Sequence, residues 1–260
     1  MQFAVIGNPI AHSLSPILHN HAFKALGIAG FYGRYLLSKD ASFYSLRSLH
    51  LKGANITVPF KETAFQSCDE VFGIAREIGA VNTIVFDKGK MLGYNTDALG
   101  FYQCMESLNA KNALIIGAGG SAKAIACILN EKGIVPTIIN RSADRLAAFQ
   151  SFECATFENF KPKIPYDLII NTTPAGLIDN ALPLDSNILS PLLQNAQFAL
   201  DIVYGARTPF LNLANTLKIP NADGKAMLIN QAILAFKIFM ESQNISINQE
   251  TLRHSMQNIL

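Results

Sequence analysis

The sequence predicts an α/β fold in two parts, an N-terminal α/β domain followed by a doubly wound parallel-sheet domain. The chain has 260 residues, a length that favours two domains over one. Short apolar runs alternate with helical stretches, which is typical of strands joined by crossover helices. The uninterrupted apolar run ALIIG after Asn112 indicates a parallel strand that is buried on both faces of its sheet.

The N-terminal part alternates strands and helices. Ser15 precedes Pro16, a pair that predicts an N-cap followed by the first residue of a helix. Asn95 or Thr96 is suited to cap a later helix. We expect strands at residues 2–6, 31–37, 54–58 and 80–86, and helices at 15–26, 42–49, in the stretch up to 76, and at 97–108.

The C-terminal part begins with the strand after Asn112, and a glycine-rich turn then opens a helix to about residue 132. Further buried strands are expected at 136–140, 167–171 and 198–203, and closing helices at about 224–241 and 249–258. We expect the closing helices to fold back onto the first part. One domain would then comprise residues 1–100 completed by 225–260, and the other residues 101–224.

Composition and charge exclude several classes of protein. Half of the residues are hydrophobic and 15% are charged, which predicts a compact globular chain rather than a disordered one. The net charge is +2 without a basic run, so neither nucleic acid nor a membrane surface is an expected partner. The start MQFAVIGNPI lacks the features of a signal peptide, and no apolar window approaches the ~20 residues of a membrane span. We therefore expect a soluble, cytoplasmic protein.

Neither a disulfide framework nor a metal site is predicted. The four cysteines lie far apart and form no C-x-x-C pair. His19 and His21 are two residues apart, so on a helix they point in different directions and cannot bind one metal ion together.

A glycine-rich turn follows the strand after Asn112 and fits the pattern G-x-G-x-x-[G/A] of dinucleotide-binding folds. The glycines permit a tight turn and a close approach of the backbone to a pyrophosphate, and the helix N-terminus supplies N–H donors. An ordinary glycine-rich turn between strand and helix is the alternative. The residues expected to contact the pyrophosphate are Gly117, Ala118, Gly119, Gly120 and Ser121.

The end of the next strand favours NADP over NAD. An NAD site usually carries an acidic residue there, whereas this chain carries Asn140, Arg141, Ser142 and, one turn later, Arg145. A guanidinium binds a dianionic phosphate, which a carboxylate would repel. The alternative is that both arginines are surface charges beside a loop.

Three polar clusters of the first part are candidates for a substrate site, since they lie at the ends of its elements. Ser13 and Ser15 flank a helix start, where hydroxyls and the helix terminus favour a carboxylate. Thr57 and Lys61 surround the Val-Pro-Phe turn, and the third cluster comprises AVNT at 80–83 and GYNTD at 93–97. Simple N-capping, a loop lysine and a helix-start aspartate are the alternatives. The residues by themselves indicate an NADP-binding enzyme with a polar cleft.

In order and spacing, segments over nearly the whole chain resemble the shikimate dehydrogenase family. These segments are GNPIAHSLSPILHN, GANITVPFKE, GAVNTI, GYNTDALGF, GAGGSAKA, NRS, NTTPAG and GKAMLINQA. The resemblance implies a substrate-binding domain joined to a Rossmann domain that binds NADP. It implies reversible hydride transfer between NADPH and 3-dehydroshikimate, giving shikimate, in the biosynthesis of chorismate and the aromatic amino acids.

The resemblance also implies roles for particular residues. Lys61 matches the catalytic lysine of the family, and Asp97 matches the aspartate paired with it. The positions that match substrate contacts are Ser13, Ser15, Asn55, Thr57, Asn82, Tyr204 and Gln231. The positions that match the cofactor site are residues 117–121, Asn140 to Arg145 and, near the nicotinamide, Thr173, Gly224 and Met227.

Three alternatives stay open at this point. A sibling enzyme would use quinate, or would accept both substrates and NAD. A reductase for a different ligand would keep the glycine turn without needing the two serines. A non-catalytic NADP-binding sensor would have no reason to keep Lys61 and Asp97 together. A homodimer is one assembly that the sequence allows.

Overall fold

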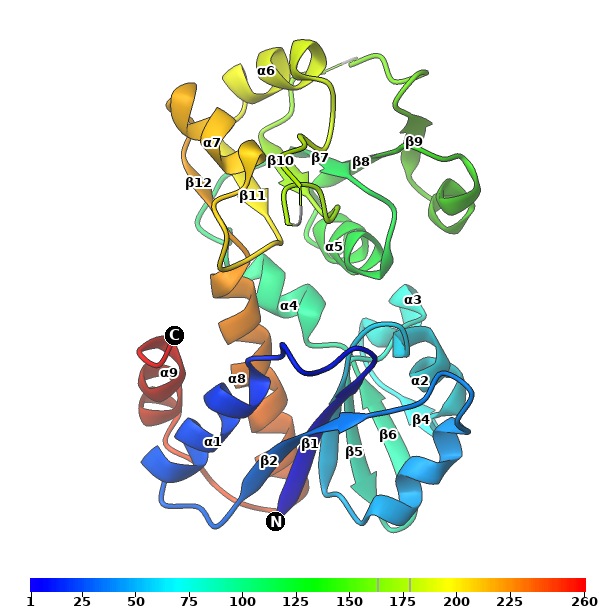
Figure 1. Ribbon diagram of the computed structural model, residues 1–260, viewed down its shortest axis with the longest axis vertical. Helices are drawn as coiled ribbons and strands as arrows, with labels where there is room; N and C mark the ends of the chain where they lie inside the picture. The colour runs from blue at the N-terminus through cyan, green and yellow to red at the C-terminus, as the bar shows by residue number, and fades with distance from the viewer. Residues whose placement is uncertain (163, 178) are drawn as a thin grey trace. The chain divides into compact units, whose positions relative to one another are not determined.

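The computed structural model describes residues 1–162, 164–177 and 179–260, and its contacts divide the chain into two compact units (Figure 1). Unit 1 comprises Met1–Gly100 and Ile229–Leu260, and unit 2 comprises Phe101–Leu228. The boundaries fall inside two helices, α4 (Asp97–Tyr102) and α8 (Lys225–Ser242). Unit 1 is therefore discontinuous in sequence, with its last helices supplied by the end of the chain.

Unit 1 contains a six-stranded mixed sheet in the order β2-β1-β3-β5-β6-β4. β1 pairs in parallel with β2 and β3, whereas β5 runs antiparallel to both β3 and β6. The strands are β1 (Gln2–Gly7), β2 (Phe31–Leu36), β3 (Gly53–Ile56), β4 (Glu70–Val71), β5 (Thr83–Asp87) and β6 (Lys90–Tyr94). Strand β6 was not predicted from the sequence. Lys88 and Gly89 both have positive φ and form a two-residue hairpin turn between β5 and β6. Because the turn is so short, residues 88–94 were interpreted as one loop.

The helices of unit 1 pack an aromatic core onto this sheet. Phe3 of β1 lies 5.5 Å from Phe23 and 4.9 Å from Phe239, measured between ring centroids. Phe236 of α8 lies 4.8 Å from Phe23, so the end of the chain completes the core begun by its start. The helices are α1 (Ser15–Ala25), the 3₁₀-helix η1 (Phe43–Leu49), α2 (Lys61–Ser67), α3 (Ala75–Ile78), α4, α8 and α9 (Gln249–Gln257).

Three local predictions for unit 1 were wrong. Ser15 is the first residue of α1 rather than its N-cap, and Leu14 occupies the cap position without a side-chain hydrogen bond. The helical stretch up to residue 76 is interrupted by β4, which pairs with β6. The helix expected at 97–108 ends at Tyr102, and the chain continues in tight turns such as the bond from the Met105 N–H to the Tyr102 carbonyl.

Unit 2 contains a six-stranded parallel sheet in the order β12-β11-β10-β7-β8-β9. Counted along the chain from β7, this is the doubly wound order 3-2-1-4-5-6 of dinucleotide-binding folds, so the predicted fold class is confirmed. The strands are β7 (Asn112–Ile116), β8 (Val135–Asn140), β9 (Glu153–Thr156), β10 (Leu168–Asn171), β11 (Phe198–Asp201) and β12 (Asn221–Ala222).

The helices of unit 2 close its apolar core. They are α5 (Gly120–Glu131), the 3₁₀-helix η2 (Asp144–Phe149), α6 (Ser186–Gln194) and α7 (Pro209–Thr216). Asp185 caps α6 and Thr208 caps α7, each by accepting a backbone N–H. Neither of these two helices was predicted from the sequence, nor were the short strands β9 and β12. The four cysteines are free thiols, and none of the helices in the described ranges is long and apolar enough to cross a membrane.

Candidate active site

Lys61 and Asp97 form an ion pair in unit 1. Lys61 Nζ donates to Asp97 Oδ2 at 2.7 Å, and the two side chains are 21% and 14% exposed. Lys61 is the first residue of α2 and Asp97 the first residue of α4. The positive end of a helix macrodipole disfavours a lysine and favours an aspartate, so the pairing offsets an unfavourable position for Lys61. A proton donor and its anionic partner are thus held together and remain accessible to solvent.

The chain around Lys61 is fixed by backbone contacts. The Val81 N–H donates to the Lys61 carbonyl at 2.9 Å, which ties α2 to the segment that leads into β5. Phe60, just before Lys61, is buried in the core of unit 1, while Val58 is 58% exposed. The buried Phe60 ring and the hydrogen bond from Val81 together anchor the start of α2.

Ser13 and Ser15 are adjacent at the start of α1. Ser13 Oγ donates to Ser15 Oγ and accepts from the Ser15 N–H, both at 3.3 Å. Arg34 of β2 donates from Nε and Nη2 to the Ser13 carbonyl, at 3.1 and 2.6 Å. Two hydroxyls beside a helix start and a nearby guanidinium form a group that favours a carboxylate.

Asn55 and Asn82 belong to a buried polar network. Asn55 Nδ2 donates to Thr83 Oγ1 at 3.0 Å, and Thr83 Oγ1 donates to Asn82 Oδ1 at 3.0 Å. Asn82 Nδ2 donates to Thr96 Oγ1 at 3.0 Å, directly before Asp97 in the chain. Tyr32 donates from its hydroxyl to Asn55 Oδ1 at 2.6 Å. The amides are therefore oriented by fixed partners before any ligand arrives.

Thr57 and Gln231 are placed by close approaches to glycines. A Cβ at Gly7 would clash with Thr57 Cγ2, so the end of β1 lies against this threonine. A Cβ at Gly100 would lie 2.7 Å from the Gln231 backbone nitrogen. Gly100 is one turn after Asp97 on α4, so the Gln231 region of α8 lies next to the helix that carries the aspartate.

In unit 2 the glycine-rich turn has the geometry of a phosphate cradle. Gly117 has φ +111°, a conformation that favours glycine, and lies against the Thr172–Thr173 segment. A Cβ at Gly119 or Gly120 would meet nothing within 4 Å, so the backbone is open on that side. Gly119 is the N-cap of α5 and makes no side-chain cap bond, which leaves the helix N–H groups available to an anion. Ala118 and Ser121 are partly exposed beside these glycines.

The segment after β8 brings Asn140, Arg141, Ser142 and Arg145 together at the surface. Asn140 Nδ2 donates to the Ser142 carbonyl at 2.9 Å and to its hydroxyl at 3.2 Å, which closes the turn. Both arginines are exposed, and neither forms an ion pair with a carboxylate in the part of the chain that the structure describes. The residues therefore fit the dianionic phosphate that distinguishes NADP.

The three candidates for the nicotinamide end lie on two segments of unit 2. Thr173 donates from its hydroxyl to Asn171 Oδ1 at 2.7 Å. Gly224 donates its N–H to the Val203 carbonyl at 3.1 Å and leaves no room for a Cβ beside Ile202. Met227 is buried one turn after Gly224. At Tyr204, a candidate for substrate contact, the burial of the side chain raises the pKa of the hydroxyl. Tyr204 therefore keeps its proton at neutral pH, and its hydroxyl is able to donate a hydrogen bond.

Sequence reasoning missed the residues that support these side chains. Tyr32 was not singled out, because its bond to Asn55 depends on strand pairing rather than on local pattern. Thr83 and Thr96 were placed in the third polar cluster, but their hydrogen bonds to Asn55 and Asn82 were not predicted. Asp201 was also missed, although a carboxylate at the end of a buried parallel strand is a detectable signal.

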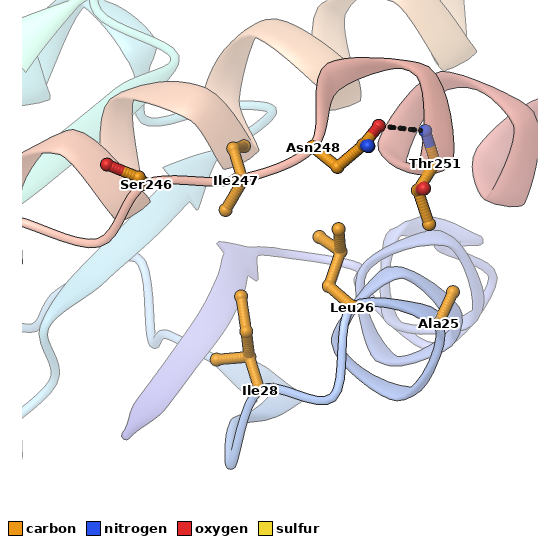
Figure 2. Close-up of a pocket in the computed structure, with 7 residues that line it drawn as sticks. All are labelled: Ala25, Leu26, Ile28, Ser246, Ile247, Asn248 and Thr251. Atoms are coloured by element: carbon orange, nitrogen blue, oxygen red, sulfur yellow. Dashed lines mark hydrogen bonds between the residues drawn. The ribbon is translucent and has the colours of Figure 1, made fainter.

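Two further observations delimit the site. Figure 2 shows a pocket lined by the end of α1 and residues 246–251, where Asn248 Oδ1 accepts from the Thr251 N–H. It contains none of the candidate residues. Within the described ranges, no group of three or more His, Cys, Asp or Glu side chains is placed to hold a metal ion.

Comparisons with known proteins give consistent matches. The family profile described as the shikimate dehydrogenase substrate binding domain matches residues 5–84. A protein of Helicobacter hepaticus named shikimate dehydrogenase (NADP(+)) is 52% identical over 255 residues, which cover 96% of this chain and 95% of the relative. A protein of the same name from Helicobacter pylori strain P12 is 50% identical over 246 residues, which cover 93% of each chain.

Solved structures resemble the whole chain. Shikimate 5-dehydrogenase from Thermus thermophilus, in complex with NADP(H) and shikimate, aligns with a TM-score of 0.85 at 31% identity and covers 100% of both chains. Shikimate dehydrogenase from Aquifex aeolicus aligns with a TM-score of 0.84 at 30% identity, covering 99% of this chain and 98% of that one.

Proposed function

The chain belongs to the shikimate dehydrogenase family, and we propose on that premise that it interconverts shikimate and 3-dehydroshikimate with NADP as the cofactor. The observation that carries the proposal is the Lys61–Asp97 pair at 2.7 Å, because a non-catalytic binding protein has no use for it. NADPH supplies the hydride when it is bound, and the residues of the chain handle the proton and the orientation of the substrate.

Lys61 transfers the proton. In reduction, the oxygen of the substrate carbonyl becomes a hydroxyl, and the Lys61 ammonium donates the proton it needs. In oxidation, the proton leaves the hydroxyl for the lysine. Asp97 holds Nζ in one orientation and accepts a hydrogen bond from the same hydroxyl, which restricts the geometry of transfer.

The remaining polar residues of unit 1 bind the substrate. Ser13 and Ser15 hold the carboxylate at the start of α1. Asn55 and Asn82 present amides to the ring hydroxyls, and their internal partners set the amide orientation. Thr57 and Gln231 complete the proposed substrate contacts of unit 1. Tyr204, a residue of unit 2, is a further proposed substrate contact.

Unit 2 binds the cofactor. The open backbone of the glycine turn and the uncapped start of α5 receive the pyrophosphate. Arg141 and Arg145, with the Asn140–Ser142 turn, receive the 2′-phosphate. Thr173, Gly224 and Met227 lie at the nicotinamide end.

The proposal extends to the setting in which the protein works. Its substrates are small molecules, and the balanced charge of the chain supports function without nucleic acid or a membrane. Four free cysteines are typical of a reducing compartment, which supports a cytoplasmic location. A homodimer is the assembly to test, by light scattering of the purified protein.

The decisive experiment is to mix the purified protein with shikimate and NADP and record the near-ultraviolet absorbance of reduced nicotinamide. Parallel reactions replace shikimate with quinate, or NADP with NAD. We expect a rapid rise only with shikimate and NADP. A comparable rise with quinate or NAD would identify the alternative enzyme, which accepts both substrates or both cofactors. A flat trace from folded protein that binds NADP would refute the proposed substrate.

A further inference from the structure

Asp201 is a buried carboxylate that joins three segments of unit 2. It is the last residue of β11 and has no exposed surface. Its partners come from the end of β10, from the turn after β11 and from the start of α7. All of them are neutral donors, and the proposed reaction gives this residue no direct role.

Each oxygen of Asp201 has a defined partner. Thr208 donates from Oγ1 to Oδ2 at 2.6 Å, while Oδ1 accepts from the Val203 N–H at 3.0 Å and from Asn171 Nδ2 at 3.1 Å. Burial raises the pKa of the Asp201 carboxyl, and these three bonds act in the opposite direction. Donors that converge on both oxygens are the arrangement that a carboxylate requires in the interior.

The bonds continue from Asp201 to the loop that carries Thr173. Asn171 has its amide nitrogen on Asp201, so its Oδ1 is directed to the Thr173 N–H at 3.0 Å and to the Thr173 hydroxyl at 2.7 Å. Gly176 ends this loop against Thr208, where a Cβ would lie 3.0 Å from the threonine Cβ. The loop is therefore anchored at both ends by groups that bind Asp201.

The second branch leads to Tyr204. The Val203 N–H is bound to Asp201, and the Val203 carbonyl accepts from the Gly224 N–H at 3.1 Å. Thr208 also caps α7 by accepting from the Leu211 N–H at 3.4 Å. Val203, which precedes Tyr204, is thus held through both its N–H and its carbonyl.

We propose that Asp201 is a positioning residue for the nicotinamide end of the cofactor site. It orients the Asn171 amide, which sets Thr173, and it holds the backbone that presents Tyr204 and Gly224. This inference rests on the proposed function, because Thr173 and Gly224 contact the nicotinamide only if the chain binds NADP as proposed.

The test compares two ligands of the full-length protein, NADP and adenosine 2′,5′-bisphosphate, which lacks the nicotinamide. In Asp201→Asn, an NH₂ group replaces one carboxylate oxygen and faces a group that donated a hydrogen bond to that oxygen. We expect the Kd for NADP to rise about tenfold or more and kcat to fall, while the Kd for the bisphosphate stays within about twofold of wild type.

Thr208 provides a second variant with a matched partner. Thr208→Val removes the donor at constant shape and should give the same selective loss for NADP, whereas Thr208→Ser keeps the hydroxyl and should restore most of the affinity. Thr137→Val is the control, because Thr137 is buried in the same sheet and its hydroxyl has no hydrogen-bond partner in the described structure. It should leave both affinities unchanged.

The proposal is overturned if Asp201→Asn and Thr208→Val bind NADP as wild type does, or if they lose both ligands equally. It is also overturned if Thr208→Ser behaves like Thr208→Val. Failure of the proposed function is a separate result, since wild-type protein would then bind NADP without oxidising shikimate, and the binding comparison would still be decisive.

Discussion

Single residues carry the chemistry, and Lys61 is the clearest case. Its position at the start of α2 is unfavourable for a cation, and its pairing with Asp97 comes from a helix start 36 residues away. A loop lysine selected only for solubility would have no reason to make this contact. The geometry therefore favours the catalytic interpretation over the surface one.

Lys61→Ala should reduce kcat by about 10²–10⁴-fold, because it removes the proton donor, with a smaller change in the KM for shikimate. Steady-state kinetics in both directions measures the effect. Lys52→Ala, which removes an exposed lysine of the same unit, should behave as wild type. Near-native turnover of Lys61→Ala would refute the assignment.

Arg141 is the residue that we propose to bind the 2′-phosphate of NADP. Arg141→Ala should raise the KM for NADP by about tenfold or more and change the KM for NAD little, since only NADP carries the 2′-phosphate. The measurement is the ratio of kcat/KM for the two cofactors. Arg253→Ala, at an exposed position of α9, is the control. Equal effects on both cofactors would remove the phosphate-clamp interpretation.

At the scale of elements, close approaches between helices position the site. α4 and α8 meet at Gly100, where the absent side chain admits the backbone of Gln231. The two helices thereby bring Asp97 and Gln231 near each other, and a larger residue at this crossing would separate them.

Gly100→Ala should destabilise the protein by about 1–3 kcal/mol, because its Cβ would lie 2.9 Å from the Gln231 Cα, and neither backbone can move freely. The displaced α8 should also raise the KM for shikimate. Thermal unfolding and substrate kinetics test the two effects. A variant with native stability and native KM would show that the crossing adapts without consequence.

At the scale of the whole molecule, stability depends on a buried histidine. His19 stacks on Tyr32 with ring centroids 4.1 Å apart, and neither of its nitrogens has a hydrogen-bond partner among the described residues. Burial lowers the pKa of His19 to about 3. The unfolded chain takes up a proton near pH 6.5, whereas the folded chain does not.

The free energy of unfolding should therefore fall as pH decreases from about 6.5 towards 3, and His19 should account for about 1.4 kcal/mol per pH unit. In His19→Leu this contribution is absent, so between pH 6.5 and 5 the variant should lose about 2 kcal/mol less than wild type. Denaturant unfolding followed by circular dichroism measures both slopes. Measurements near pH 8 are the control, because the His19 imidazole is neutral there in both the folded and the unfolded chain. The pH dependence of the two proteins should not differ in that range through His19. Parallel slopes below pH 6.5 would contradict the prediction.

The sequence alone determined the doubly wound half and its glycine turn, and it located the two arginines proposed to bind phosphate, because periodicity and turn chemistry are local properties of the chain. It also placed most strands and helices. It failed at β4, where pairing with β6 overrides a helical preference, at β6, which follows a two-residue hairpin turn, and at the end of α4, where the chain enters tight turns. Only the tertiary structure decided which distant side chains meet. The pairing of Lys61 with Asp97, the Tyr32–Asn55 bond and the donors around Asp201 all depend on sheet order and register, which no local pattern encodes.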